Sequence, residues 1–449
     1  MSIWANVIKR FRAPALPIPT RDYDANYFNQ LLSILRLYFN QLDNLLEQIV
    51  DAAPVNVQFY GSALDAFGRA RFSQPYTLFD SQNRYAKNDL FDETTATGGS
   101  VAYVANASTV NLEVTASSGS EVVRQSYRSF SYQPGKSLLV MNTFVMPTAS
   151  ANQRIRIGYF NTENGVFLER DGTSVYITRR TYVTGTAVDT RVAQADWNGD
   201  KLNGTGDSTF TLDLTKAQIF WQDFEWLGVG SVRCGFVING QVIICHTFQN
   251  ANNLTSVYMT TAMLPVRYEI TNTGASTGAV LKQICSTVIS EGGYEKKVAP
   301  LVARMTVVNS NVTTSLLPLV SIRLASGRTG AVVIPDGYNV LPTASASTTF
   351  EIVLIKNPTL TGASWGATDS SNVEYDTTAT ALSGGTIVES TYVLSSNQAR
   401  GAASGGSDYN WDLQLGATIG GTSDIYTVAA RTLSGTQNAI GSLSFWDLT

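Results

Sequence analysis

The chain has 449 residues, of which 15% are charged, and its formal net charge at pH 7 is −4. Because soluble proteins average roughly 25% charged residues, we expect a neutral surface rich in hydroxyl and amide groups. Nucleic-acid binding needs clustered Lys and Arg, and only Lys9, Arg10 and Arg12 form such a cluster, so the composition argues against it. The length predicts two or three domains.

No apolar run approaches the ~20 residues that span a bilayer, and residues 1–19 lack the long apolar core of a signal peptide. We therefore expect a soluble chain that is neither inserted into a membrane nor exported by the Sec route. Cys234, Cys245 and Cys285 lack metal-ligand spacing, and we interpret them as free thiols. Cys234 and Cys245 flank a predicted hairpin, so a facing pair stays an alternative.

Residues 1–55 are predicted to form an extended arm followed by a helix. Prolines at 14, 17 and 19 favour a polyproline-like arm. Asp24 is the expected N-cap of a helix over residues 24–50, and Pro54 ends it. Apolar residues recur in this helix at alternating steps of three and four, which is the seam of a coiled coil. The seam residues are Phe28, Leu31, Leu35, Tyr38, Leu42, Leu45 and Ile49.

The apolar stripe of this helix is broader than the seam. Additional apolar side chains lie outside it, namely Tyr27, Leu32, Ile34, Leu37, Phe39 and Leu46. A two-stranded coiled coil buries a narrower face, so the helix must bury more than one face. Self-association into a trimer, docking on another protein, and packing against the chain's own β domain all satisfy this requirement.

Two antiparallel β-sandwiches are predicted after a connecting segment at 56–100. From about residue 100 the pattern has a period of two, with turn residues between short strands, which indicates an antiparallel β-sandwich over 101–292. Asn239-Gly240 predicts a type I′ hairpin within 232–248. A charged Gly-Gly segment near 290–300 is the expected linker to a second β-sandwich over 300–449. The fold class is therefore mainly β with one N-terminal helix.

Enzyme motifs are missing from the sequence. The single histidine, His246, adjoins Cys245 on a predicted strand, and adjacent strand residues point to opposite faces, so the two do not form a dyad. Asp223 and Glu225 lie two apart on a strand-like run, as a glycosidase pair could, but a half-buried strand accounts for them better. We expect a non-enzymatic protein that needs no cofactor.

Two further groups of residues are weaker binding candidates. Trp221 and Trp226 could provide a platform for a glycan, against the simpler interpretation that they belong to the core. Asp196, Asn198 and Asp200 are spaced like the first ligands of a calcium loop. Lys201 occupies the position where the sharp turn of that loop needs glycine, so an ordinary turn-rich loop is the preferred interpretation.

Several segments resemble tailed-phage virion proteins. Residues 23–44 resemble an N-terminal helix of structural proteins from marine and cyanobacterial phages. Similarity to a large family of phage virion proteins with a concanavalin-like sandwich is carried by the segments 65–85, 156–180, 197–208, 220–241 and 264–270. KNPTLTG at 356–362, SGGTIVES at 383–390 and TSDIYTVAARTL at 422–433 resemble the second β domain of that family.

The resemblance implies a structural component of the virion, of the tail-fibre or baseplate type, with other virion proteins as partners. The arm and helix would dock and oligomerise, with a homotrimer as the expected assembly, and the β domains would contribute to host-surface attachment. A lectin that recognises a host-surface glycan and a head or neck decoration protein are the alternatives. The position on the particle, the oligomeric state and the receptor stay open at the level of sequence.

Overall fold

A computed structural model describes residues 16–18, 24–51, 72–296, 298–306, 310–343, 346–368, 371–396, 402–405 and 411–449. The chain forms two compact units, Met1–Phe72 and Ser73–Thr449. The predicted proline-rich arm lies outside the described residues except for 16–18, and so does most of the predicted connecting segment before Phe72.

The predicted helix is confirmed as α2 (Ala25–Asp51). The Asn26 N–H donates to Asp24 Oδ1 at 2.8 Å, so Asp24 caps the helix as expected. Among the described residues, no helix has the length and apolar content needed to cross a bilayer. The side chains of residues 43–51 lie outside the description, and the predicted seam residues Leu45 and Ile49 are among them.

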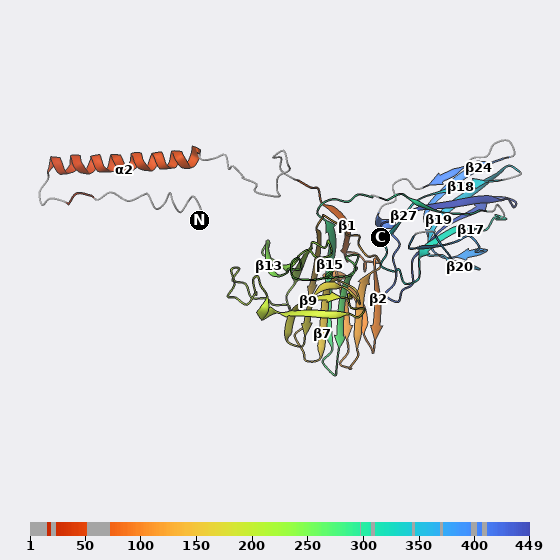
Figure 1. Cartoon of the computed structure of the whole chain (residues 1–449), viewed down its shortest axis with the longest axis horizontal. Coiled ribbons are helices and arrows are strands. Elements are labelled where there is room, and N and C mark those ends of the chain that lie inside the picture. The colour runs from red at the N-terminus through yellow and green to blue at the C-terminus, as the bar shows by residue number, and fades with distance from the viewer. Residues whose placement is uncertain are drawn as a thin grey trace. The chain divides into compact units, whose positions relative to one another are not determined.

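Two antiparallel sheets form the first sandwich (Figure 1). In the described residues one sheet contains, in spatial order, β13 (Gln241–Phe248), β12 (Val232–Ile238), β11 (Gln218–Phe224), β6 (Leu138–Val145), β15 (Ala279–Ser290), β4 (Thr109–Val114) and β3 (Ser100–Val104), with β1 (Tyr76–Gln82) also paired to β15. The other contains β10 (Val188–Ala193), β9 (Ser174–Thr181), β8 (Gly165–Asp171), β7 (Gln153–Phe160), β14 (Val266–Asn272), β5 (Glu121–Ser126) and β2 (Phe91–Ala96).

The first sandwich starts earlier in the chain than its sequence predicts. β1 pairs with the end of β15, and β2 pairs with β5, although both strands lie within the segment 56–100 that we expected to be a connection. Phe79 and Phe91 from these strands are buried in the core. The partners of β1 lie about 200 residues away, so no local pattern reveals this pairing.

Alternation along the strands builds the core of the first sandwich. In β6 every second residue from Leu138 to Phe144 is buried, and the neighbouring β11 buries Phe220 and Phe224 in the same layer. Ile157 and Tyr159 of β7 face them from the opposite sheet. Burying one such side chain stabilises the fold by about 1.5–3 kcal/mol, so these alternating positions hold the two sheets together.

The hairpin between β12 and β13 has the predicted turn. Asn239 and Gly240 adopt φ angles of 52° and 77°, which are the two left-handed conformations that a type I′ turn requires. The predicted linker also lies between strands, because β15 ends at Ser290 and the next strand begins at Leu301.

The second sandwich also consists of antiparallel sheets. Its four-stranded sheet contains β16 (Leu301–Arg304), β27 (Ala439–Asp447), β18 (Val333–Pro342) and β25 (Ala403–Gly405), as far as residues are described. Its six-stranded sheet contains β21 (Gly366–Ala367), β22 (Val373–Asp376), β17 (Leu317–Leu324), β26 (Ile425–Thr432), β19 (Thr348–Lys356) and β24 (Thr386–Ser395), and β20 (Thr359–Thr361) pairs with β23 (Ala381–Ser383). Short 3₁₀ turns occur at η2 (Ala105–Ala107), η3 (Gln194–Asp196) and η4 (Trp411–Leu413). The mainly β fold class with two sandwich domains is confirmed.

The two sandwiches share a packed junction. Val332, just before β18, and Ile334 in β18 belong to the hydrophobic core of the first sandwich, and Leu448 packs against it. The C-terminus accordingly lies close to β27 and the first sandwich in Figure 1. Ala417 donates its N–H to the Tyr127 carbonyl at 2.8 Å. Apolar burial and backbone hydrogen bonds therefore join the sandwiches into one unit.

Candidate functional site

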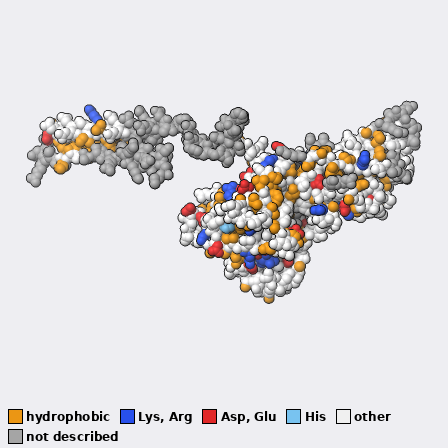
Figure 2. All heavy atoms as spheres, viewed as in Figure 1, with side chains coloured by type: hydrophobic (Ala, Val, Ile, Leu, Met, Phe, Trp, Pro, Cys, Tyr) orange, Lys and Arg blue, Asp and Glu red, His pale blue; other side chains and the backbone are white. Residues whose placement is uncertain are grey.

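The seam of α2 is half-buried or exposed wherever its side chains are described. Leu31, Leu35, Tyr38 and Leu42 are half-buried, whereas Phe28 is 44% exposed. Three of the apolar residues outside the seam are also exposed, namely Leu32, Leu37 and Phe39. Figure 2 shows hydrophobic side chains at the surface of the described part of the helix. No side chain of α2 between Ala25 and Leu42 is buried, so the described part of this helix leaves an apolar face open.

Trp221 lies on the outer face of the first sandwich. Its neighbours in β11, Phe220 and Gln222, point into the core, so the indole points outward and is half-buried. Met141 of β6 is its cross-strand neighbour, and the Arg233 guanidinium lies 5.6 Å from the indole ring. The ring is therefore accessible only in part.

Trp226 has a structural environment. Its indole N–H donates to the Met259 carbonyl at 3.3 Å, and its ring meets Tyr132 edge to face at 5.9 Å. Trp226 packs against the core at the turn after β11, whereas the Trp221 side chain lies on the outer face of the sheet. The structure therefore does not bring the two tryptophans together on one platform.

The predicted calcium-like loop covers the edge of β13. Asn198 exchanges two hydrogen bonds with the backbone of Thr247, at 2.8 and 2.9 Å. Gly199 and Asp200 donate their N–H groups to the carbonyls of Cys245 and Ile244. The loop thus pairs with a strand edge that would otherwise be open to other chains.

The acidic side chains of this loop bind backbone groups. The Asp200 carboxylate accepts hydrogen bonds at 2.8 Å from the N–H groups of Leu202 and Ser208. Burial raises the pKa of Asp200, but these hydrogen bonds outweigh it and hold the pKa below its ordinary value. Asp196 is exposed. Among the described residues no cluster of acidic, histidine or cysteine side chains could hold a metal ion.

His246, Cys234 and Cys245 are buried in the first sandwich, whereas Cys285 is half-buried. His246 is buried, meets Phe248 edge to face at 4.6 Å, and accepts a hydrogen bond from the Asn198 N–H at 3.4 Å. Burial lowers its pKa. Cys234 and Cys245 are buried free thiols, and burial raises the pKa of Cys245 to about 12. Thiols with such a pKa stay protonated at neutral pH and are poor nucleophiles.

Asp223 and Glu225 do not form a facing pair. β11 ends at Phe224, so Glu225 lies in the following turn, where its carboxylate accepts hydrogen bonds from the N–H and hydroxyl of Ser231. The Asp223 carboxylate accepts from Arg233 Nε at 2.8 Å. Burial raises the pKa of Asp223, and Arg233 offsets part of this shift. The strand-like run predicted over both residues is therefore wrong at Glu225, because β11 ends at Phe224.

The outer face of the opposite sheet carries a network of buried ion pairs. Glu169 is fully buried and accepts from Arg156 Nε at 3.0 Å and Arg191 Nε at 2.9 Å. Arg156 also lies 3.5 Å from Glu269. Burial raises the pKa of Glu269, but Arg267, Arg156 and Arg154 lower it by more, so the net pKa lies below its ordinary value. A carboxyl group in this state is ionised at neutral pH and unsuited to general acid catalysis.

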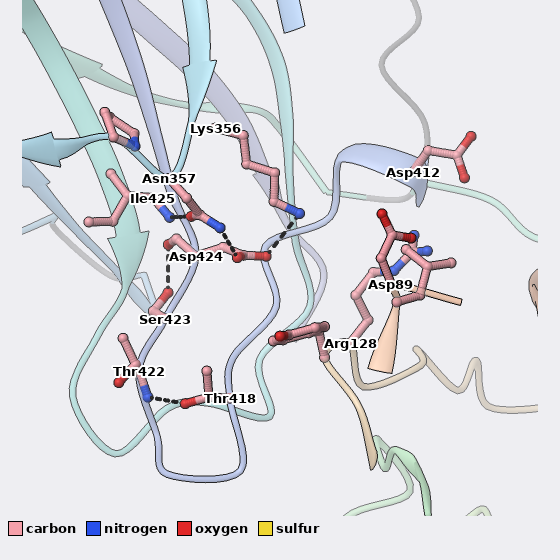
Figure 3. A pocket seen from close by; sticks show the side chains of 13 residues that line it. Asp89, Arg128, Lys356, Asn357, Asp412, Thr418, Thr422, Ser423, Asp424 and Ile425 are labelled. Atoms are coloured by element: carbon pink, nitrogen blue, oxygen red, sulfur yellow. Dashed lines mark hydrogen bonds and ion pairs between the residues drawn. The ribbon is translucent and has the colours of Figure 1, made fainter. Parts of the chain in front are cut away.

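A polar pocket of about 400 Å³ lies at the junction of the two sandwiches (Figure 3). One wall comes from the first sandwich, at the start of β2 and the end of β5. The other comes from the second sandwich, at the end of β19 and the loop before β26. The lining consists of Asp89, Leu90, Tyr127, Arg128, Lys356, Asn357, Pro358, Asp412, Thr418, Thr422, Ser423, Asp424 and Ile425. We call this the junction pocket.

Asp424 organises the second-sandwich wall of the junction pocket. Its carboxylate accepts from Asn357 Nδ2 at 2.7 Å and from the Gly416 N–H at 3.0 Å, and it lies 3.2 Å from Lys356 Nζ. Figure 3 shows Lys356 and Asn357 pointing toward this carboxylate. Three donors thus satisfy the Asp424 carboxylate, and these contacts hold the end of β19 against the loop before β26.

The first-sandwich wall contains a buried arginine. Arg128 is 6% exposed, and its guanidinium lies 6.0 Å from the Phe79 ring. Burial lowers the pKa of Arg128, and the charges of Asp412 and Asp424 counteract that effect. Burial is also the main cause that raises the pKa of Tyr127. In Figure 3 Arg128 and Asp89 stand across the pocket from Asp424.

The junction pocket is not among the sites predicted from the sequence. Its walls combine residues near 89 and 127 with residues near 356 and 424, and contacts over such separations leave no periodic signal. The segments 356–362 and 422–433 contain the sequence feature that could have indicated it, because polar residues flank the strand ends there. These two segments meet in the pocket.

No family model matches the chain, and no curated protein matches it. Similar solved structures include an endo-β-1,4-glucuronan lyase from the fungus Trichoderma reesei, with 11% identity and a TM-score of 0.31 over 47% of this chain and 95% of that one. A Bacillus licheniformis β-glucanase gives 12% identity and a TM-score of 0.29 over 49% and 99%. A carbohydrate esterase from the Shiga toxin-encoding bacteriophage phi24B gives 12% and 0.28 over 48% and 98%. Similarity this low carries no activity or ligand over to this chain.

Proposed function

We propose that the protein is a structural component of a bacteriophage virion, an appendage protein that assembles through α2 and presents two β-sandwiches. The observation that carries the proposal is the open apolar face of α2. Between Ala25 and Leu42 this helix has ten of the seam and neighbouring apolar residues named above, yet none of its side chains is buried.

An isolated helix gains little stability from its own hydrogen bonds. Most helical stability in proteins comes from packing an amphipathic face against a partner. Leu35 and Leu42, one heptad apart on the seam, are suited to pack against the same positions of neighbouring helices. The broad stripe that includes Leu32 and Phe39 suits three helices better than two. We therefore propose a homotrimer.

The resemblance of residues 23–44 and of both β domains to tailed-phage virion proteins supports the particle setting. The environments of His246, Cys245 and Glu269 support a non-enzymatic role, since the thiol is protonated and the carboxylate is ionised. Tail, baseplate, neck and head positions on the particle are all compatible with this function.

Incorporation into particles tests the proposal. Phage would carry either Leu35→Glu/Leu42→Glu on the seam or Ser33→Glu/Asn40→Glu on the polar side, which adds the same charge at the same seven-residue spacing. Mass spectrometry of purified particles should detect the second variant and the wild type but not the first. Normal incorporation of the seam variant would refute the assembly role, and a map of the intact particle would locate the protein.

A further inference from the structure

We infer that the junction pocket binds a neutral saccharide. This inference goes beyond the proposed assembly role and does not depend on it, since the pocket belongs to the unit Ser73–Thr449 and the assembly helix to the other. The pocket volume of about 400 Å³ falls in the ~300–1,000 Å³ range of small-molecule sites.

The charges of the lining exclude several ligand classes. Two cationic and three carboxylate side chains give it a formal charge of −1, which disfavours an anion. Within the described residues no acidic cluster is dense enough for a metal ion. An apolar ligand would leave these charged and hydroxyl groups unsatisfied on desolvation. A neutral ligand with many polar groups meets none of these penalties.

The remaining polar groups suit sugar hydroxyls. Each sugar hydroxyl donates one hydrogen bond and accepts others, so its site must offer both donors and acceptors. The exposed Asp89 carboxylate lines the pocket and offers an acceptor. The Thr422 hydroxyl lies on the opposite side of the pocket and offers both functions. Lys356, already paired with Asp424, still has two ammonium protons to donate.

The walls are held in place before any ligand binds. Asp424 fixes the end of β19 through Asn357, and the loop 418–422 closes on itself through the Thr422 N–H and Thr418 Oγ1 at 2.9 Å. Gln414 Nε2 anchors the same region to the Ser129 carbonyl of the first sandwich at 2.7 Å. Such preorganisation reduces the entropy lost on binding. The site exists only where the two sandwiches meet.

Binding to a glycan array tests this inference on the full chain. The array would carry neutral glucose, galactose, mannose and N-acetylhexosamine oligosaccharides, with sialylated and sulfated counterparts as anionic probes. We expect binding to neutral members and saturation-transfer NMR contacts to the protein. Recognition of only the anionic members, or of no member, would overturn the inference.

Variants locate the binding site. Asp89→Ala and Thr422→Ala alter exposed side chains, so the fold should persist. Each variant should weaken neutral-glycan binding about tenfold or more, because it removes hydrogen bonds between the pocket and the ligand hydroxyls. Asp207→Ala removes an exposed carboxylate elsewhere and should leave binding unchanged. Trp221→Ala should also leave it unchanged.

Loss of binding in Trp221→Ala but not in Asp89→Ala would move the site to the outer sheet face and contradict the proposal. The seam variant Leu35→Glu/Leu42→Glu should keep the affinity of a single site, measured with a monovalent oligosaccharide. Loss of assembly without loss of monovalent binding therefore separates this inference from the proposed virion role.

Discussion

The apolar side chains of the two units have different environments. In the first sandwich Phe220 is fully buried and meets Phe236 at a ring distance of 5.5 Å. In α2 Phe39 is 56% exposed, and no described side chain of the helix is buried. The sandwiches thus complete their cores within the chain, whereas the described part of the helix, residues 25–42, has an apolar face that is not buried.

Stability and assembly depend on different units of the chain. Burial within the chain makes the sandwich unit stable irrespective of concentration, whereas a helix that depends on other copies is stable only when they bind. Substitutions in one unit should therefore change folding, and substitutions in the other should change association.

The largest expected effect comes from truncating the same residue type in the two units. Phe220→Ala should lower the free energy of unfolding of the sandwiches by about 3–5 kcal/mol, since it leaves a cavity in a closed core. Phe39→Ala should leave that free energy unchanged. Denaturant titration followed by tryptophan fluorescence measures both, and an equal loss in the two variants would show that Phe39 also belongs to a core within the chain.

The ion pairs of the first sandwich predict a loss of stability in acid. Because the pKa of Glu269 is lowered from 4.5 in the folded state, the ionised carboxylate favours folding. This contribution is complete above about pH 4.5 and is lost as pH falls through the folded-state value. Glu269→Gln should destabilise the sandwich by about 3 kcal/mol at pH 7 and flatten the dependence on pH below 4.5.

The control for this prediction is Glu163→Gln, which alters an exposed carboxylate. Unfolding curves at pH 7 and at decreasing pH should match those of the wild type. If Glu269→Gln retains the full acid dependence, other carboxylates are responsible for it.

A smaller effect is expected at the junction between the sandwiches. A Cβ at Gly416 would lie 2.8 Å from the Tyr127 carbonyl oxygen, whereas one at Gly420 would lie no closer than 3.8 Å to its nearest neighbour. Gly416→Ala should therefore cost about 1–3 kcal/mol by overpacking. Calorimetry should show the sandwiches beginning to unfold separately, while Gly420→Ala keeps the wild-type profile.

The smallest effect is expected at the N-cap of α2. Asp24→Ala removes the acceptor for the Asn26 N–H and should cost about 1 kcal/mol of helix stability, whereas Asp24→Asn retains an acceptor. Hydrogen exchange at the start of the helix should accelerate several-fold in the first variant alone. Equal exchange in both variants would show that the cap contributes nothing.

Local patterns in the sequence predicted the local structure. The steps of three and four from Phe28 onward predicted the helix. Asn239-Gly240 predicted the turn between β12 and β13, because a type I′ turn requires two consecutive left-handed residues. Alternation predicted the sandwiches. Each of these signals acts within one or two elements.

Pairings between distant segments could not be predicted from local patterns in the sequence. Tyr76 of β1 pairs with Ser290, and nothing near either residue indicates the other. Asn198 was read as a possible metal ligand because its spacing is local, but its partner Thr247 on the β13 edge is remote. The junction pocket was missed for the same reason, since Asp89 and Asp424 meet only after both sandwiches have folded.

The molar mass of the intact protein in solution shows whether α2 joins three chains. Light scattering should give about three times the 48.5 kDa chain mass for the wild type and for Ser33→Glu/Asn40→Glu, and one chain mass for Leu35→Glu/Leu42→Glu. A wild-type protein that stays monomeric at micromolar concentration, or a seam variant that assembles like the wild type, would contradict the account.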